Sequence, residues 1–417
     1  MTHRNSNFSA PTTTELAATA ERLAPLAREH ALEAERRRDL VPEVVEAFRQ
    51  AGLHRLYMPK RFGGFGLDWG AHFTVGERLS RECGACGWLT SLVFSHIMFV
   101  ARFHPEVQEE FFARSGPHAT LATGSAGGGT LLREGDAWRL KGRWAFVSGV
   151  NVASGVMVTG REGNTAPLTH FVLLHPGEYR VHDTWHSEGL RGTGSHDVTV
   201  EDLLVPARRV VPLHEFASAA HPGAAIAESY VHRVSPPLYQ KSWFLAPLLG
   251  TARGALQSYL EQTRRRTGRL LGESIVTQVP VQVRIGEASA QLDAAALIFA
   301  DVLRELHLCG SEGQAIEGER LLRMRRIVTL GARMCYSAAD SLASMMGVTG
   351  QVAANPVQRL FRDCRTTVTH IELNWDHSMA PTGKARLGVP TGDPLVDGPI
   401  AAAAGQPAGA PTLGTQI

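Results

Sequence analysis

The chain has 417 residues, of which 44% are hydrophobic and 20% are charged. This length and composition predict a globular protein of two or three domains and exclude fibrous and very small folds. Because 42 Lys+Arg balance 40 Asp+Glu, the chain lacks the basic surface that phosphate backbones require, so the sequence predicts no nucleic-acid binding.

Residues 13 to 120 are predicted to form an N-terminal helical domain. Between Glu15 and Arg38, apolar residues recur at the i, i+3, i+4 spacing of an amphipathic helix, and Pro42 suits the first turn of the next helix. A long helical stretch is expected from about Trp69 to Phe103.

Residues 121 to 225 are predicted to form a central β domain. Four glycines between residues 124 and 129 suggest a flexible loop or hairpin, and short β-like segments punctuated by Gly or Pro follow it. The predicted strands are Thr130 to Arg133, Ala137 to Phe146, Val156 to Gly160, His170 to Leu174, Tyr179 to Trp185 and Ser195 to Val205.

Residues 226 to 390 are predicted to form a C-terminal four-helix bundle, because four long helical patterns succeed one another. The predicted helices are Trp243 to Thr267, Pro280 to Cys309, Ala315 to Met346 and Pro356 to about Ser378. The remaining stretch, 391 to 417, is rich in Ala, Gly and Pro and is expected to be a flexible tail.

The five cysteines are odd in number and scattered, and the sequence shows no signal peptide and no apolar run of about 18 residues. These features predict a cytoplasmic protein with no membrane contact. Cys83 and Cys86 form a tempting pair, but no second pair or His ligands stand in register with it, so no metal site is expected.

The order of a helical domain, a β domain and a four-helix bundle resembles the acyl-CoA dehydrogenase superfamily. The resemblance rests on local motifs, which are GRWAFVSG at 142–149, WHSEGLRGTGSHDV at 185–198, PVQRLFRD at 356–363, and His370 with NWD at 374–376. They are similar to those of the oxygenase components of two-component flavin-dependent monooxygenases, such as p-hydroxyphenylacetate hydroxylase and the steroid-degrading phenol hydroxylases.

This resemblance implies an α+β multidomain fold with a central antiparallel β-barrel or sandwich. It also implies an enzyme that uses reduced FMN or FAD and O2, through a C4a-hydroperoxide, to hydroxylate an aromatic, phenolic substrate. The chain shows no Gly-x-Gly-x-x-Gly between a strand and a helix, so a separate flavin reductase is the expected partner. A homotetramer, arranged as a dimer of dimers, is expected as well.

The resemblance gives catalytic roles to two residues. The hydroxyl of Ser148 is expected near flavin N5, with a plain turn before Gly149 as the alternative. His370 is expected in the last bundle helix above the substrate, where a neutral imidazole can accept a phenol proton and so make the ring more nucleophilic. A histidine packed in the core is the alternative for His370.

Four residues of the β domain are candidates for flavin contacts. Trp144 and Phe146 alternate along one strand and are expected on one face, where they either wall the isoalloxazine or fill the core between domains. Thr193 and Ser195 are expected close to flavin or substrate, or else only in a turn.

The remaining candidates lie in three other segments. His96 is expected to face the substrate from an otherwise apolar helix, and Thr123, in the glycine-rich loop that packs on the flavin, is expected to contact the substrate as well. Arg264 is the candidate contact for a flavin phosphate, since a guanidinium matches a phosphate well. Gly347 is expected to approach the flavin of an adjacent subunit. A core histidine, a flexible hairpin, a solvated charge run and an ordinary loop are the respective alternatives.

Three rival functions remain open from the sequence. A true acyl-CoA dehydrogenase needs a carboxylate base about eight residues after the Arg-Asp of the bundle, where this chain has Ile371. Glu372 is one residue further, about 100° around a helix, and no Gly-Thr follows it. An oxygenase of the same superfamily that attacks nitrogen or sulfur is the second rival, and a cofactor-free scaffold is the third.

Overall fold

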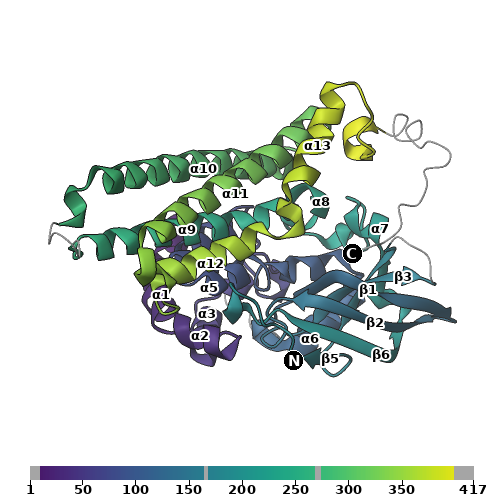
Figure 1. Ribbon diagram of the computed structural model, residues 1–417. Helices are drawn as coiled ribbons and strands as arrows, with labels where there is room; N and C mark the ends of the chain where they lie inside the picture. The colour runs from purple at the N-terminus through teal and green to yellow at the C-terminus, as the bar shows by residue number, and fades with distance from the viewer. Residues whose placement is uncertain (1–9, 164–167, 268–273, 399–417) are drawn as a thin grey trace, which may run out of the picture.

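The computed structural model describes residues 10–163, 168–267 and 274–398 of the chain. In Figure 1 the long C-terminal helices lie above the N-terminal helices, and the β-sheet lies beside the N-terminal helices. Helical N- and C-terminal parts around a central sheet confirm the predicted fold class.

The N-terminal part is helical but more broken than its apolar pattern suggests. The stretch predicted from Trp69 to Phe103 is not one helix, because Cys83 is extended, with φ −150° and ψ 110°, and the α-helix that follows ends at Ser91. The helices are α1 (Thr13–Glu29), α2 (Ala31–Arg37), α3 (Pro42–Gln50), α4 (Ala71–Glu82), α5 (Gly84–Ser91), the 3-10 helix η3 (His96–Arg102) and α6 (Pro105–Ser115).

The segment Gly84–Arg102 corrects one sequence expectation. It is long and apolar enough to cross a membrane by length and composition, although no apolar run of that length was expected. Every residue of its most apolar window is buried inside the protein, and the segment contains both α5 and η3. Its apolar character is therefore accounted for by a place in the core.

The strands form one seven-stranded sheet in the order β5-β6-β2-β1-β3-β4-β7. The strands are β1 (Ala122–Glu134), β2 (Ala137–Val147), β3 (Val156–Glu162), β4 (His170–Leu174), β5 (Arg180–His182), β6 (His196–Pro206) and β7 (Val210–Pro212). β1 and β3 pair in parallel, so the sheet is mixed and not wholly antiparallel as expected. The short strand β7 was not predicted.

The glycine-rich segment is part of strand β1, which corrects the expectation of a loop. Gly127 has φ 103° and the register shifts between Gly124 and Gly129, so the strand is bulged. A Cβ on Gly129 would lie 2.7 Å from the Trp144 ring, and one on Gly124 would lie 3.1 Å from Trp144 Cβ. The glycines therefore make room for the Trp144 side chain in the sheet core.

The C-terminal part contains the four long helices of the bundle, followed by a shorter one. The helices of this part are α7 (Leu213–Ala217), α8 (Pro236–Tyr239), α9 (Leu245–Thr263), α10 (Val279–Ser311), α11 (Gly318–Met345), α12 (Pro356–Val368) and α13 (Trp375–Arg386). The 3-10 helix η9 (Gln240–Phe244) leads into α9.

The fourth bundle helix ends ten residues earlier than predicted, and this corrects the placement of His370. α12 ends at Val368, in a run of β-branched residues that disfavours helix, and His370 caps the 3-10 helix η12 (Ile371–Leu373). His370 thus lies in the turn between α12 and α13 and not within a helix.

The predicted tail begins with an anchored segment. The carboxylate of Asp393 accepts a hydrogen bond from Arg325 of α11 at 2.5 Å, and that of Asp397 accepts from the Thr391 hydroxyl at 2.9 Å. Residues 399–417 of the predicted tail lie outside the described residues.

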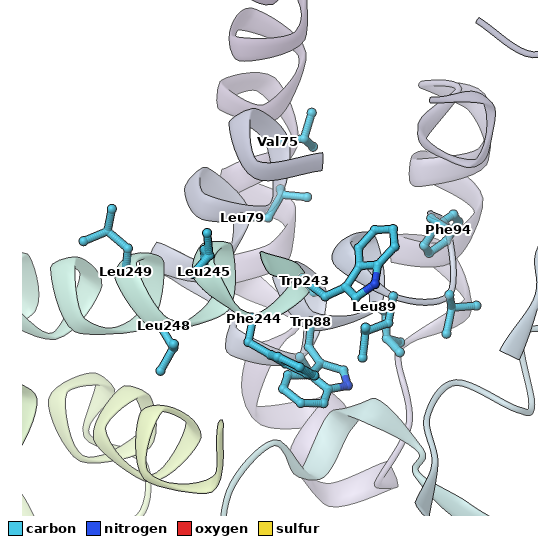
Figure 2. Close-up of a cluster of buried hydrophobic side chains, with 14 of the residues drawn as sticks. Val75, Leu79, Trp88, Leu89, Phe94, Trp243, Phe244, Leu245, Leu248 and Leu249 are labelled. Carbon is cyan, nitrogen blue, oxygen red and sulfur yellow. The ribbon is translucent and has the colours of Figure 1, made fainter. Parts of the chain in front are cut away.

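One apolar core joins the N-terminal helices to the bundle, and a second fills the sheet. Figure 2 shows the first core where Val75 and Leu79 of α4 approach Leu245 of α9. A Cβ on Gly250 of α9 would lie 2.3 Å from the Glu77 carbonyl, so the absence of a side chain lets α4 and α9 touch.

Candidate active site

A row of three hydroxyls begins at Ser148, directly after strand β2. Ser148 Oγ lies 2.8 Å from Ser195 Oγ, which lies 2.7 Å from Thr193 Oγ1. Thr193 donates to the Leu190 carbonyl at 2.8 Å, and Trp88 Nε1 of α5 donates to Ser148 Oγ at 3.0 Å. The structure therefore brings together three residues that the sequence had nominated separately.

The hydrogen bonds in this row have a defined direction. A carbonyl only accepts, so the single hydroxyl proton of Thr193 is committed to Leu190, and Ser195 must donate to Thr193. Ser148 must then donate to Ser195, while it accepts from Trp88. Ser148 Oγ keeps one free lone pair and no free proton, so it can bind a further hydrogen-bond donor but cannot donate.

This polarity fits the flavin that the sequence predicted. A reduced isoalloxazine carries a hydrogen on N5, whereas the oxidised ring has only a lone pair there. Ser148 is half-buried, while Thr193 and Ser195 are buried behind it. The row thus presents one acceptor toward the surface, and that acceptor suits the reduced form of the cofactor.

The loop that carries Thr193 and Ser195 is fastened to the bundle. The buried carboxylate of Asp363 in α12 accepts a hydrogen bond from the Leu190 backbone at 2.7 Å, and Arg362 donates to the Glu188 carbonyl at 2.5 Å. Burial raises the pKa of Asp363 to about 6, opposed chiefly by the cation of Arg359. Two of the sequence motifs are therefore in direct contact, and α12 sets the position of the hydroxyl row.

His370 lies against an aromatic wall that also reaches Ser148. Its ring centroid is 4.2 Å from that of Phe244 and 6.1 Å from that of Trp88. Trp88 therefore lies beside both expected catalytic residues, with a hydrogen bond to Ser148 and a T-shaped ring arrangement with His370. Burial, and next the charge of Lys241, lower the pKa of His370 to about 4, so the imidazole is neutral at pH 7.

His96 and Thr123, two expected substrate contacts, are bonded to each other. Thr123 Oγ1 lies 3.1 Å from His96 Nδ1, and the imidazole packs edge-on against Trp243 at 5.0 Å. Burial lowers the pKa of His96 to about 3, so this ring is neutral as well. His96 is buried, with 6% of its surface exposed, which also suits the alternative of a core histidine.

Trp144 and Phe146 do not share a face, so that expectation is wrong. The register with β6 shifts between Trp144 and Val147, and Phe146 adopts φ 61°, which turns its side chain outward. Phe146 is 63% exposed, while Trp144 is fully buried and donates to the Thr159 carbonyl at 2.8 Å. This placement of Trp144 favours the core alternative over a flavin wall.

Arg264 and Gly347 lie together at the far end of the bundle. Arg264 is exposed just beyond α9, and the nearby Arg266 donates to the carbonyl of Met346, next to Gly347, at 3.4 Å. The 19 residues of α9 span about 28 Å, so this end is remote from Phe244 and His370. The pair therefore suits contact with a flavin of an adjacent subunit better than with one bound at Ser148 of the same chain.

Three aromatic residues were missed from the sequence as parts of the site. They are Trp88 of α5 and Trp243 and Phe244 of η9, directly before α9, and all three are labelled in Figure 2; the ring centroids of Trp88 and Phe244 lie 5.3 Å apart. Each is at most 6% exposed, so a sequence pattern of buried apolar positions does not distinguish them from core. Their closeness to Ser148, His96 and His370 follows only from the tertiary fold.

Comparison with known proteins shows matches at both ends of the chain. The family models "Acyl-CoA dehydrogenase, N-terminal domain" and "Acyl-CoA dehydrogenase, C-terminal domain" match residues 13–114 and 242–375. The oxygenase subunit HsaA of a flavin-dependent monooxygenase from Rhodococcus jostii is 28% identical over 386 residues, covering 90% of this chain and 98% of the relative.

Two further relatives agree with this match. The oxygenase component of an FADH2-dependent resorcinol hydroxylase from a Rhizobium species is 29% identical, covering 88% of this chain and 92% of its own. The solved structure of XiaF from a Streptomyces species, in complex with FADH2 and glycerol, is 26% identical and superposes with a TM-score of 0.84. That superposition covers 92% of this chain and 97% of XiaF.

Proposed function

The chain belongs to the acyl-CoA dehydrogenase family, and we propose that it is the oxygenase component of a two-component flavin-dependent monooxygenase. It uses reduced flavin and O2 to hydroxylate an aromatic, phenolic substrate. The directed hydroxyl row that ends on Ser148 is the observation that carries this proposal. The names of the relatives supply the reaction class and the reduced flavin.

The residues of the site divide the work of binding. Ser148 would hold the N5 hydrogen of the reduced flavin, with Ser195 and Thr193 fixing the direction of its hydroxyl. When bound, the reduced flavin activates O2 and supplies the oxygen atom that is transferred. Trp88 and Phe244 exclude water from the space beside His370, which limits the loss of reducing power as hydrogen peroxide.

His370 would contact the phenolic oxygen of the substrate. It is neutral at pH 7, and one face of its ring is covered by Phe244. A neutral imidazole at this position can activate the phenol through a hydrogen bond to its oxygen. His96, which is hydrogen-bonded to Thr123 and packs on Trp243, would form a further boundary of the substrate site.

The partners follow from the same proposal. A separate reductase supplies the flavin as FMNH2 or FADH2, as the component and subunit names of the relatives suggest. A homotetramer, as a dimer of dimers, would bring Arg264 and Gly347 of one subunit to the flavin of another. A cytoplasmic location agrees with five free cysteines among the described residues.

An acyl-CoA dehydrogenase activity is the alternative within the family. Its base would have to be Glu372, whose carboxylate lies 3.8 Å from the Lys241 ammonium. That carboxylate is thus paired with Lys241, and no Gly-Thr follows Glu372, so this arrangement does not favour abstraction of a proton from a thioester.

The test is to mix the protein with chemically reduced FMN or FAD, air-saturated buffer and a panel of phenols. Hydroxylated product is measured by mass spectrometry, and released hydrogen peroxide is measured in parallel. We expect product to form with at least one phenol at the expense of peroxide. Oxidation of an acyl-CoA with an artificial acceptor and no reductase, or failure to bind either flavin, contradicts the proposal. If oxygenated product forms from amines or thiophenes but not from phenols, the enzyme is an oxygenase that attacks nitrogen or sulfur and not an aromatic hydroxylase.

A further inference from the structure

The ring of His370 is fixed by the turn that follows it. His370 Nδ1 accepts a hydrogen bond at 3.2 Å from the backbone N–H of Glu372, which makes His370 the side-chain cap of η12. A nitrogen that accepts from an N–H carries no proton of its own. The neutral imidazole therefore has its proton on Nε2, and it presents a donor on the side away from the turn.

Lys241 lies against the same turn from the other side. Its ammonium donates to the Glu372 carbonyl and, at 3.3 Å, to Ser378 Oγ of α13, and it lies 3.8 Å from the Glu372 carboxylate. Ser378 Oγ is also hydrogen-bonded to Thr329 Oγ1 of α11, at 2.8 Å. Lys241 thus ties the His370 turn to two helices of the bundle.

The residues that hold the His370 turn and cover the His370 ring belong to one short helix. Lys241 and Phe244 both belong to η9, where Lys241 holds the turn and Phe244 covers the ring at 4.2 Å. Only 17% of the Lys241 side chain is exposed. Its ammonium is therefore mostly removed from solvent and committed to these contacts. A buried cation is costly, which argues that this one has a positional purpose.

We propose that Lys241 is a positioning residue, which clamps the Glu372 turn so that His370 meets the substrate as an Nε2–H donor and not as a proton acceptor. This inference rests on the proposed function and deepens it. A base at Nε2 would need its proton on Nδ1, and Nδ1 could then no longer accept from Glu372. Breaking the clamp removes this constraint.

An Nε2–H donor on His370 can activate a phenol without taking its proton. An N–H donor at the phenolic oxygen stabilises the phenolate form, and the phenol gives up its proton to the bulk solvent as it enters the site, so that the site itself holds the phenolate. The phenolate ring is electron-rich and attacks an electrophilic oxygen, which is the outcome that the sequence had assigned to proton transfer onto His370. The imidazole remains neutral throughout, in keeping with its low pKa.

The charges around His370 come from several elements. Lys241 of η9 repels a proton on the ring, and Glu372 of η12 pairs with Lys241. Burial, and also the charge of Arg325 of α11, lower the pKa of Lys241. Arg325 is itself paired with Asp393 at 2.5 Å. His377 of α13 lines the same cavity as Lys241 and Glu372. Removing Lys241 therefore raises the pKa of His370.

The test uses the protein without flavin, labelled with 15N in its histidines. The signal of His370 is identified as the one missing from His370→Gln, and its tautomer is read from the two ring nitrogens. Lys241→Met removes the clamp and the charge. Lys241→Arg keeps the charge, and a cavity of about 260 Å³ beside Lys241 leaves room for the larger side chain. Lys141→Met removes an exposed lysine of β2 and is the matched control.

We expect the wild type and Lys141→Met to show the Nε2–H tautomer with no titration of His370 near neutral pH. In Lys241→Met the titration should move to higher pH, and kcat should fall about tenfold to a hundredfold, as for a misplaced catalytic group. Lys241→Arg should keep the titration low.

An Nδ1–H tautomer in the wild type overturns the inference, as does a Lys241→Met variant with unchanged tautomer, titration and kcat. Because the spectra need no flavin, they separate the two proposals. If the expected tautomer is observed but no phenol is hydroxylated, the proposed function is contradicted while the positioning of His370 by Lys241 is still supported.

Discussion

The two sides of the site achieve order by different means. The sheet side, formed by Ser148, Ser195 and Thr193, is a directed row of hydroxyls whose protons are all committed. The bundle side, formed by His370 and Phe244, has one imidazole held neutral by burial against an aromatic ring. The first arrangement suits a partner with a fixed hydrogen-bonding pattern, and the second suits an apolar ring with one polar atom.

Trp88 is the residue that the two sides share. Its indole N–H belongs to the hydroxyl row and its ring to the aromatic wall. Substitutions on the two sides should therefore impair different steps. Changes on the sheet side should affect flavin binding, and changes on the bundle side should affect the fate of the substrate.

The largest effect is expected on the bundle side. His370→Ala should lower hydroxylation by about a hundredfold or more while the protein still binds reduced flavin, because only the contact with the substrate is removed. His370→Gln keeps an N–H donor and should retain part of the activity. Product and peroxide yields after mixing with reduced flavin and O2 give the result. Equal loss in both variants, or loss of flavin binding in either, contradicts the division between the two sides.

The next effect concerns the carboxyl that holds the sheet side. Burial raises the pKa of Asp363 to about 6 from its ordinary 3.8, so the folded protein binds this proton more tightly than the unfolded chain does. Its stabilising contribution is therefore complete below pH 3.8 and is lost as pH rises through 6, by about 3 kcal/mol.

Asp363→Asn isolates this effect, because its amide does not titrate. The free energy of unfolding of the wild type, relative to that of Asp363→Asn, should decrease between pH 4 and pH 7 in denaturant titrations. A relative stability that rises with pH shows instead that the carboxylate is stabilised by Arg359 and Arg362 more than burial disfavours it.

A smaller effect separates two serines of the hydroxyl row. Ser148→Ala should weaken binding of reduced flavin about tenfold, since one hydrogen bond is lost. Ser195→Ala keeps the Ser148 hydroxyl but frees its proton, so the preference for reduced over oxidised flavin should narrow. Anaerobic fluorescence titrations with both redox forms measure this. An unchanged preference in Ser195→Ala means that the direction of the row does not matter.

The smallest effect is expected at the shared residue. Trp88→Phe removes the indole N–H from Ser148 but keeps an aromatic ring beside His370. Flavin binding and the yield of product should each fall about threefold, as expected for a hydrogen bond of modest net strength. A loss confined to flavin binding would show that Trp88 acts only through Ser148, and a loss confined to product yield would show that it acts only beside His370.

Much of the fold follows from local pattern. The long helices of the bundle were predictable because apolar periodicity over many residues is a strong signal, and each of the six predicted strands overlaps an observed strand. The glycine-rich part of β1 was mistaken for a loop. Its glycines leave room for the Trp144 side chain on the neighbouring strand, and this contact cannot be predicted from the local sequence.

The site was only partly predictable. Ser148, Thr193 and Ser195 were proposed through a family resemblance, and the direction of their hydrogen bonds appeared only with the Leu190 carbonyl in place. A bulge turned the Phe146 side chain to the face opposite the one predicted, because side chains alternate regularly along a strand only where the strand pairing is regular. Lys241 has no signal in the sequence, since its role depends on a turn more than a hundred residues away.

The most direct test of the central claim uses isotopic oxygen. The protein is supplied with reduced flavin, a phenol that it accepts and ¹⁸O2 in unlabelled water, and the product is analysed by mass spectrometry. A monooxygenase places one ¹⁸O atom in the new hydroxyl group. A product whose new oxygen comes from water, or flavin oxidation that yields only hydrogen peroxide with every phenol, contradicts the account.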